Sequence, residues 1–387
     1  RHYGNLMPCT LKGSQPISSS FSDGIDEIDG EQGFSGPTLQ KEGTLYKEFR
    51  FKEGSTSHYG AHATAMTGVY TGNVNINAHP KNPTIFELYR KHNSPSMSAK
   101  NAWWVSDSEG LYANLNYSSR AGYGANYGAN YIRPSSFTES AGFDSLGNPK
   151  EYNEEIVEKI KSIRGFCDAN FSSQYNGVAN SILHDEVDKK EIEDFLQQCV
   201  EGGAVGEFND PWDINLDPSN PIFNSDMKAV HFAEKIIDQF QPELLVVNMH
   251  EADIAHINFT KYANNLHKMD YALGHLWNHI KNNPKMTGNT ILIAMPEHGR
   301  NEETNQFNDQ YGQFALDHNN TGMSREIFAL VVGPNDKVVQ DEIHTFDPIT
   351  GDPIGESIDI VPTIANILGF DNDIPVGLLN GNVLTES

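Results

Sequence analysis

Acidic and imidazole side chains gather beside three apolar segments in the second half of the sequence. They follow the segments 243–250 and 289–296 and precede the segment 326–334: Asp253, His256, Glu297, His298 and His318. Carboxylate oxygens and imidazole nitrogens are ligands for divalent metal ions. A single histidine after a strand is more commonly a hydrogen-bonded loop residue, but three such groups in succession favour a metal site. We expect zinc as the ion, with manganese or calcium as alternatives.

Strands and helices alternate in the part of the chain that must position these side chains. The expected strands are 243–250, 289–296 and 326–334, and the expected helices are 227–240, 262–280 and 359–370. This alternation predicts an α/β fold with a mostly parallel central sheet sandwiched by helices. Ligands of such sheets bind beyond the carboxyl ends of the strands. We therefore expect 243–250 and 289–296 to be nearby parallel strands of one central sheet, with helix 262–280 packed on its face.

The first half of the chain is less regular. It predicts a helix at 84–92, a strand at 101–106 and helices at 151–164 and 186–199. A short tandem repeat of Tyr-Gly-Ala-Asn occupies 123–130 and is typical of an ordered surface loop. We expect a single domain over 1–387 with a loop-rich insertion at about 107–225.

Composition excludes some partners and indicates a location. Asp and Glu outnumber Lys and Arg by 52 to 27, which gives a net charge of −25 and argues against a nucleic-acid-binding surface. No run of eighteen apolar residues predicts a membrane span. Asn-x-Ser/Thr patterns occur at or beside Asn116, Asn170, Asn258 and Asn320. A disulfide between Cys167 and Cys199 is as compatible with the sequence as free thiols. We expect a secreted or cell-surface glycoprotein, extracellular or periplasmic.

The order of these motifs resembles the alkaline phosphatase superfamily, which includes sulfatases, phosphodiesterases and cofactor-independent phosphoglycerate mutases. The resemblance rests on Asp253-x-x-His256, Tyr262, Asp270, Glu297-His298-Gly299, His318, Gly333-Pro334 and Asp359-Ile360-Val361-Pro362-Thr363. Upstream, 43–73 is similar to the segment in which a nucleophile opens a helix that ends in Thr-Gly, here Thr67-Gly68. The following helix, NPTIFELYRKH, also fits the family's order of elements.

This resemblance implies two metal ions. The first is implied to bind Asp253, His256 and His318, and the second Glu297 and His298 together with the nucleophile and an Asp that ends the family's first strand. Glu297 stands where most members have Asp, so its carboxylate reaches one methylene further. The sequence begins where that first strand would already have ended, and we find no match for its Asp. We therefore expect the Asp253 site to hold its ion more tightly and the Glu297 site to be weak or empty.

The resemblance also places the nucleophile in the segment GSTSHYGAH. Its hydroxyl residues are Ser55, Thr56 and Ser57. We expect Ser57 to be the nucleophile because it directly precedes the predicted helix start, where backbone N–H groups favour an anion, with Thr56 as the second choice. His58 occupies about the position of a sulfatase's modified cysteine, and with no cysteine nearby formylglycine chemistry is not expected. His58 and His62 are candidates for substrate or metal contacts. Arg300 is either a clamp for a phosphoryl oxygen or a surface residue.

These features predict a metal-dependent hydrolase of phosphate esters, a phosphatase or phosphodiesterase with a Ser or Thr nucleophile. Its substrate would be a small-molecule or polymeric anionic ester. The alternative is a non-catalytic, sulfatase-like relative that acts as an extracellular surface or assembly protein, and self-assembly is left open. Two features favour this alternative: Glu297 stands in place of the family's Asp, and an extended loop surrounds 123–130. Five ligand-type side chains in the expected order favour the enzyme.

Overall fold

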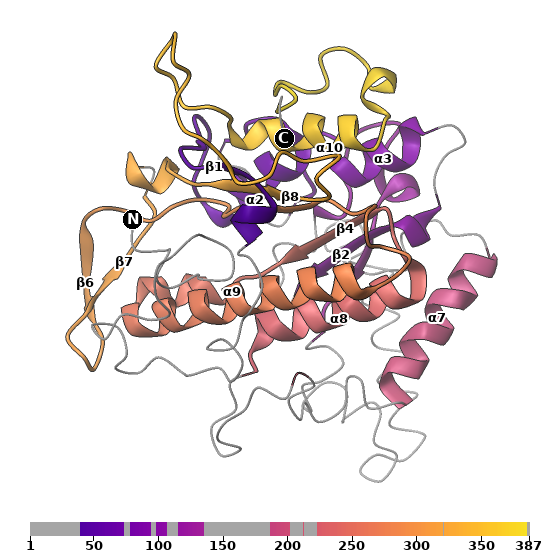
Figure 1. The fold of residues 1–387 in the computed structure, drawn as a ribbon, viewed down its shortest axis with the longest axis horizontal. Helices are drawn as coiled ribbons and strands as arrows, with labels where there is room; N and C mark the ends of the chain where they lie inside the picture. Colours follow the sequence, from indigo (N-terminus) through magenta and orange to yellow (C-terminus); the bar gives the residue numbers. More distant parts are fainter. Residues whose placement is uncertain are drawn as a thin grey trace.

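The computed structural model of the chain describes residues 39–72, 78–93, 98–106, 115–134, 186–201, 212, 223–319 and 321–384. They form an α/β fold in which strands lie between two layers of helices, as predicted from the sequence. In Figure 1, α8 and α9 lie below the strands, and α2, α3 and α10 lie above them. The helices of these layers are α2 (His58–Thr67), α3 (Ile85–His92), α8 (Ser225–Phe240), α9 (Phe259–Asn282) and α10 (Ile360–Ile367).

A parallel sheet of three strands carries the first predicted ligand segment. In spatial order its strands are β3 (Asn130–Ile132), β2 (Ala102–Ser106) and β4 (Leu244–Asn248). The side chains of β2 are fully buried because both faces of the sheet are covered, which explains the continuous apolar sequence of this strand. One face packs against α8, and the other packs against α2, α3 and α10.

A second sheet carries the other predicted ligand segment. Its spatial order is β5 (Leu292–Ala294), β8 (Ala329–Val332), β1 (Gly43–Tyr46) and β9 (Glu342–His344). β8 runs antiparallel to both β5 and β1, whereas β9 runs parallel to β1. One face packs against α8 and α9, and the other face packs against α10.

The prediction that 243–250 and 289–296 share one hydrogen-bonded sheet is wrong. β4 is an edge strand of the first sheet, and β5 is an edge strand of the second. Periodicity identifies a buried strand but not its partner, which depends on contacts far away in the sequence. The predicted packing of helix 262–280 is confirmed, because Leu276 of α9 lies in one hydrophobic cluster with Leu292 of β5.

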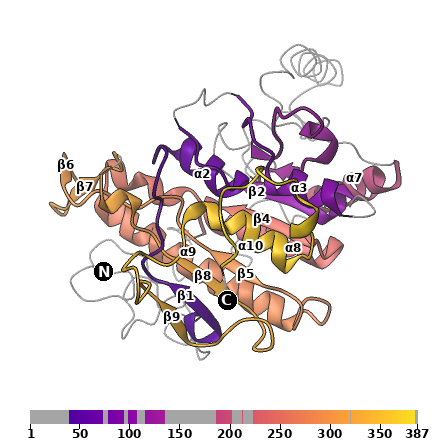
Figure 2. The ribbon, with the colours of Figure 1, turned by 90° about the horizontal axis from the view of Figure 1, so that it is seen from above.

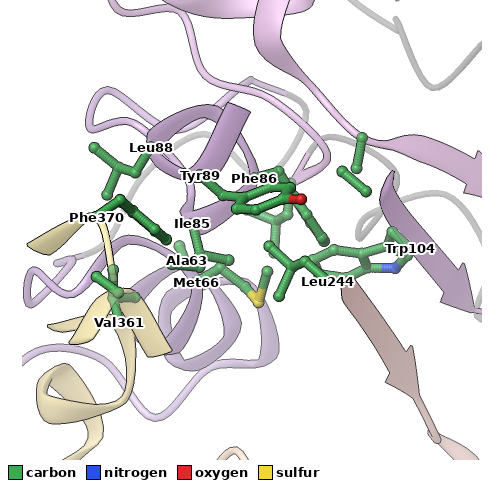
Figure 3. Close-up of a cluster of buried hydrophobic side chains, with 14 of the residues drawn as sticks. Ala63, Met66, Ile85, Phe86, Leu88, Tyr89, Trp104, Leu244, Val361 and Phe370 are labelled. Carbon is green, nitrogen blue, oxygen red and sulfur yellow. The ribbon is translucent and has the colours of Figure 1, made fainter. Parts of the chain in front are cut away.

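Helix α2 is held by caps and by a dense hydrophobic cluster. Ser57 is its N-cap, where the side chain accepts a hydrogen bond from the Gly60 amide, and Gly68 ends it in the left-handed region at a φ of 66°. Met66 packs in the cluster of Figure 3 with residues of α3, β2, β4 and α10. This packing holds α2 against the first sheet.

The remaining elements lie around this framework. They are α7 (Glu186–Glu201), β6 (Thr304–Asn308), β7 (Phe314–Leu316), and the short 3-10 helices Leu39–Glu42, Ala99–Asn101, Gly124–Tyr127, Glu251–His256, Met323–Arg325, Ser357–Asp359 and Asp371–Asp373. The predicted helices at 84–92 and 186–199 are confirmed, and the helix at 151–164 lies outside the described residues. The tandem repeat at 123–130 forms a 3-10 turn that leads into β3.

Two further sequence expectations can be compared with the structure. The Asn116 side chain is buried and donates a 3.2 Å hydrogen bond to the Ala129 carbonyl, so this asparagine is not accessible for glycosylation in the folded chain. Cys167 lies outside the described residues, and the disulfide stays a prediction. Within the described part of the chain, each helix is too short or too polar to cross a bilayer.

Candidate functional site

The structure brings all five predicted ligand residues together. Two overlapping groups have their donor atoms within 4.8 Å of one another: His58, Asp253, His256 and His318 in the first, and His58, Glu297 and His298 in the second. His58, predicted only as a further contact, belongs to both groups. The arrangement therefore resembles two adjacent metal sites that share one imidazole.

Four segments of the fold place these side chains at one site. Asp253 and His256 lie on the 3-10 helix after β4, Glu297 and His298 follow β5, and His318 follows β7. His58 is the first residue of α2. Because the carboxyl ends of β4 and β5 meet here, the expectation that these two strands end at one site holds although their sheets are separate.

His62, one turn along α2, joins the two strand ends. Its Nε2 lies 2.8 Å from the side-chain oxygen of Asn248, the last residue of β4, and its Nδ1 contacts Glu297 just after β5. The Asn248 amide donates in turn to Ser106 of β2 over 3.0 Å. A chain of side-chain contacts thus connects β2, β4 and the segment after β5.

Three of the histidines bind an outer oxygen through Nδ1 and direct Nε2 towards the other ligand residues. The Nδ1 atoms of His256, His298 and His318 lie 2.7, 2.8 and 2.7 Å from Asp317 Oδ1, Gly299 O and Thr56 O. Because these oxygens only accept, each Nδ1 carries a proton, which leaves Nε2 as the nitrogen that can ligate a metal ion. Such outer partners fix the tautomer of metal-bound histidines. The donor set therefore fits divalent ions with a preference for nitrogen and carboxylate ligands, such as zinc or manganese.

His58 connects the two carboxylates. Its Nδ1 lies 2.7 Å from Glu297 Oε1, and its Nε2 lies 3.2 Å from Asp253 Oδ1. Burial lowers the pKa of His58, but the hydrogen bonds to both carboxylates outweigh burial and raise it to about 10. Burial likewise raises the pKa of Glu297, but the neighbouring imidazoles His62, His298 and His58 bring it well below its usual value. Both carboxylates are thus ionised, and the ring of His58 lies between them.

Arg300 is part of this site and not a surface residue. Its side chain is only 9% exposed, donates over 3.1 Å to Asp253 Oδ1 and to the Ala252 carbonyl, and lies over the Tyr262 ring.

Burial, together with the positive charges of His298, His58 and Arg300, lowers the pKa of His318 to about 3. His318 is therefore a neutral imidazole at neutral pH, the form that ligates metals.

Gly299 lets the Glu297 segment approach its neighbour closely. A Cβ atom at this position would lie 2.4 Å from the Met323 carbonyl and 2.6 Å from the Glu326 carbonyl, and the Gly299 amide donates to the Ser324 carbonyl over 2.8 Å. Any larger residue would displace the backbone. The glycine therefore holds Glu297 and His298 in place.

The three candidate hydroxyls differ in environment. Ser57 is exposed at the start of α2, whereas Ser55 and Thr56 are buried. Thr56 donates to the His318 carbonyl over 2.7 Å and accepts from the ring of the same histidine, so it positions His318. Ser57 is the one of the three that solvent and a ligand can reach.

Other polar residues near the strand ends lie outside the two metal groups. His250 and Glu251 follow β4 directly, yet they belong to neither metal group, and their backbone amides donate to the buried Asp226 carboxylate. The sequence did not identify Asp317 as a site residue, although it directly precedes His318. Its role depends on a contact with His256, which is 61 positions away.

The chain also matches a known protein family. Residues 39–345 match the family model described as type I phosphodiesterase / nucleotide pyrophosphatase. The chain belongs to this family. The resemblance to the alkaline phosphatase superfamily, which was noted from the motif order, is thereby confirmed. A search of curated proteins finds no match.

Several solved structures are similar to the chain. A variant of the alkaline phosphatase PafA is 11% identical with a TM-score of 0.50, and 95% of each chain is covered. The PsFucS1 sulfatase from Pseudoalteromonas sp. is 11% identical with a TM-score of 0.43, covering 89% of this chain and 64% of that one. The phosphonate monoester hydrolase SpPMH from Silicibacter pomeroyi is 11% identical with a TM-score of 0.43, covering 94% and 72%. At these identities the similarity to PafA shows the fold alone.

Proposed function

We propose that this protein is a metal-dependent hydrolase of phosphate esters, with phosphodiesters as the first substrate class. Its family membership supports phosphodiester chemistry. The observation that carries the proposal is the common orientation of His256, His298 and His318, whose Nε2 atoms face two ionised carboxylates. Clusters of ionisable groups with perturbed pKa values are costly to assemble, which is why they mark functional sites.

The donor groups suggest which residues hold which ion. Asp253, His256 and His318 would hold one divalent ion, and Glu297 and His298 would hold the other. His58 belongs to both groups and would ligate both ions only as an imidazolate, after it releases its two ring protons. We propose zinc for both, with manganese as the alternative, because imidazole nitrogen dominates both groups. Bound ions would supply positive charge for the oxygens of the ester and lower the pKa of a nucleophile.

Ser57 is the proposed nucleophile. Its oxygen would form a bond to phosphorus while the bond from phosphorus to the leaving oxygen breaks, and the departing alcohol takes up a proton. Water would then attack this ester of Ser57, which keeps the second alcohol of a diester, release the phosphate monoester and restore the hydroxyl. Its position before the first turn of α2 supports this role, because free backbone N–H groups there favour anions. Thr56, in contrast, would position His318.

Arg300 would bind the substrate. Its guanidinium already lies beside Asp253 within the site, so an anionic ester next to the ions would find a second source of positive charge. This assignment replaces the alternative of a surface arginine.

Hydrolysis assays with three aryl substrates test the proposed function. We expect metal-loaded protein to hydrolyse bis(4-nitrophenyl) phosphate faster than 4-nitrophenyl phosphate and 4-nitrophenyl sulfate, and chelation to abolish the activity. Asp253→Asn should be inactive, whereas Asp352→Asn, a matched change at an exposed aspartate, should be active. Preferred hydrolysis of the sulfate would assign the protein as a sulfatase. No turnover with zinc, manganese or calcium would favour the non-catalytic alternative.

Trapping the covalent intermediate tests the nucleophile separately. Rapid acid quenching with a ³²P-labelled diester should give an acid-stable label on the peptide that contains Ser57, because the bond between a serine oxygen and phosphorus survives acid. An acid-labile label would instead assign the role to His58, since phosphohistidine hydrolyses in acid. A stable label on Thr56 would shift the role by one residue.

We further propose an extracellular or periplasmic location, as expected from the sequence, with a polymeric anionic ester as one class of substrate. Fractionation of the source cells would test the location. Recovery of the protein only in the cytoplasm would contradict it.

A further inference from the structure

The hairpin formed by β6 and β7 extends directly from the candidate site. Its first strand begins four residues after Arg300, and its second strand ends two residues before His318. Asn305 of β6 donates to the His256 carbonyl over 2.9 Å and to Asp317 Oδ1 over 3.1 Å. The base of the hairpin is therefore fixed to residues that belong to, or contact, one of the metal groups.

The tip of the hairpin is fixed as well. Asp309 Oδ1 accepts hydrogen bonds from the amides of Tyr311 and Gln313 in the turn, over 2.9 and 3.0 Å. Its Oδ2 accepts from the Thr260 amide in the first turn of α9, over 2.9 Å. Figure 1 and Figure 2 show the hairpin at one end of the molecule, beside α9. The hairpin is thus held at both ends, and these contacts set its position relative to the metal groups.

Three aromatic side chains of the hairpin are exposed. Phe307 of β6, Tyr311 of the turn and Phe314 of β7 are 50%, 44% and 51% exposed. Asn308 pairs with Phe314, so Phe307 and Phe314 lie at neighbouring positions of the two strands. Exposed apolar side chains that gather among polar ones mark surfaces that bind a ligand.

Exposed carboxamide side chains lie between and beside these rings. They are Gln306, Asn308, Gln310 and Gln313. Each carboxamide has two N–H donors and an acceptor oxygen, so it can bind either the hydrogen or the oxygen of a hydroxyl group. The aromatic rings can pack against the C–H faces of a sugar ring. Together these side chains match a ligand that has apolar faces and hydroxyl groups at its edges.

The charge of the hairpin restricts the kind of ligand further. Residues 301–317 contain four acids and neither Lys nor Arg. Nucleic acids and anionic lipid surfaces bind clusters of basic residues, and the acids of the hairpin would repel them. Positive charge for an ester lies at the base of the hairpin, where Arg300 is located beside Asp253. The hairpin therefore suits the uncharged part of a substrate whose phosphate lies at the metal groups.

We propose that the β6–β7 hairpin binds a chain of uncharged sugar units, which forms one alcohol of the phosphodiester. This inference rests on the proposed function, because it assigns one of the two alcohols of the ester. A strand of five residues spans about 17 Å at about 3.4 Å per residue, so the hairpin has room for several successive sugar rings. The substrate is then a phosphodiester of a glycan, and it is cleaved where the sugar chain meets the metal groups.

Titration calorimetry with neutral hexasaccharides tests the surface without any ester. The probes are cellohexaose, laminarihexaose, maltohexaose and mannohexaose, added to zinc-loaded protein. We expect at least one of them to bind with a Kd of about 1 mM or tighter. The double variant Phe307→Ala/Phe314→Ala should weaken this binding about tenfold or more, which corresponds to about 1.4 kcal/mol.

A second double variant is the matched control. Phe346→Ala/Ile349→Ala changes side chains of another loop that are 46% and 92% exposed, and it should leave the binding unchanged. Circular dichroism of both double variants checks folding. If Phe307→Ala/Phe314→Ala unfolds the chain, the two single variants replace it.

Turnover connects this surface to the site. The 4-nitrophenyl phosphodiesters of the same hexasaccharides are compared with 4-nitrophenyl methyl phosphate, which has the same leaving group but no sugar. We expect kcat/KM to be about tenfold higher or more for the diester of a hexasaccharide that binds. In Phe307→Ala/Phe314→Ala this ratio should fall to about one, because the sugar has lost its contacts.

The outcomes separate this inference from the proposed function. If no hexasaccharide binds and all diesters are hydrolysed equally, the sugar surface is refuted and diester hydrolysis stands. Binding that Phe307→Ala/Phe314→Ala retains would place the sugar elsewhere and also refute the surface. Binding that this variant loses, without hydrolysis of any diester, would support the surface and contradict the proposed function. Binding of adenosine in place of the hexasaccharides would assign the rings to a nucleobase and overturn the inference.

Discussion

Removal of His318 should weaken one metal-binding event and leave the other intact. Its Nε2 belongs to the group with Asp253 and His256, but not to the group with Glu297 and His298. His318 is the clearest histidine to remove, because its lowered pKa of about 3 makes it neutral at pH 7. No proton has to leave His318 before it binds zinc. His318→Ala therefore removes the full contribution of one ligand to the binding free energy.

The size of the effect follows from the number of ligands. Four-ligand zinc sites bind with about 10–16 kcal/mol, which is about 3 kcal/mol for each ligand. His318→Ala should therefore raise the dissociation constant of that event about a hundredfold or more, since 1.4 kcal/mol corresponds to a factor of ten. Titration calorimetry of metal-stripped protein with zinc at pH 7 measures both events, of which we expect the Asp253 event to be tighter in the parent protein.

His298→Ala is the reciprocal variant, and it should weaken only the other event. Loss of both events in either variant would show that the two groups form one site. An unchanged titration in both variants would show that these histidines are structural, and the assignment of two metal sites would be refuted.

Three further variants address shared, catalytic and remote residues. His58→Ala should weaken both zinc events in calorimetry, because this side chain belongs to both groups. Ser57→Ala should abolish diester turnover yet cost only about 1 kcal/mol in urea unfolding, mainly through the lost cap on the Gly60 amide. Glu234→Gln should cost about 3 kcal/mol at pH 7, because hydrogen bonds from histidines such as His275 lower the Glu234 pKa from 4.5 to about 2 despite burial. Its depressed pKa stabilises the fold above pH 4.5, so the difference should shrink as pH falls from 4.5 towards 2.

Each of these predictions has a control variant or an outcome that would contradict it. Glu303→Gln removes the same charge from an exposed side chain and should leave stability unchanged. An equal loss in Glu303→Gln and Glu234→Gln would indicate a net-charge effect. Loss of only one zinc event in His58→Ala would exclude a shared ligand, and full turnover in Ser57→Ala would exclude Ser57 as the nucleophile.

The sequence indicates the elements that are long and apolar but not their pairing. Helices α8, α9 and α10 follow from their periodicity, and β4 follows from a continuous apolar segment. Strand β1 was not recognised as a strand because it has only four residues, Gly43–Tyr46, and its burial depends on β8, far away in the sequence. The separation of β4 from β5 is likewise a long-range property that no local pattern contains.

The candidate site shows the same limit. Five ligand-type residues could be named because strand ends point to one edge of an α/β fold. The shared place of His58 could not be deduced, since it depends on where α2 meets both strands. Its position as the first residue of a helix was the available signal. Asp317 and Arg300 acquire their roles only through contacts across the fold, to His256 and Asp253.

Anomalous diffraction from crystals grown with zinc tests the central claim most directly. We predict two anomalous peaks on either side of the His58 ring, one next to Asp253, His256 and His318 and the other next to Glu297 and His298. Data collected above and below the zinc absorption edge would confirm the identity of the ions. Fully occupied zinc elsewhere in the molecule, with no peak at either group, would contradict the assignment of this cluster as a metal centre.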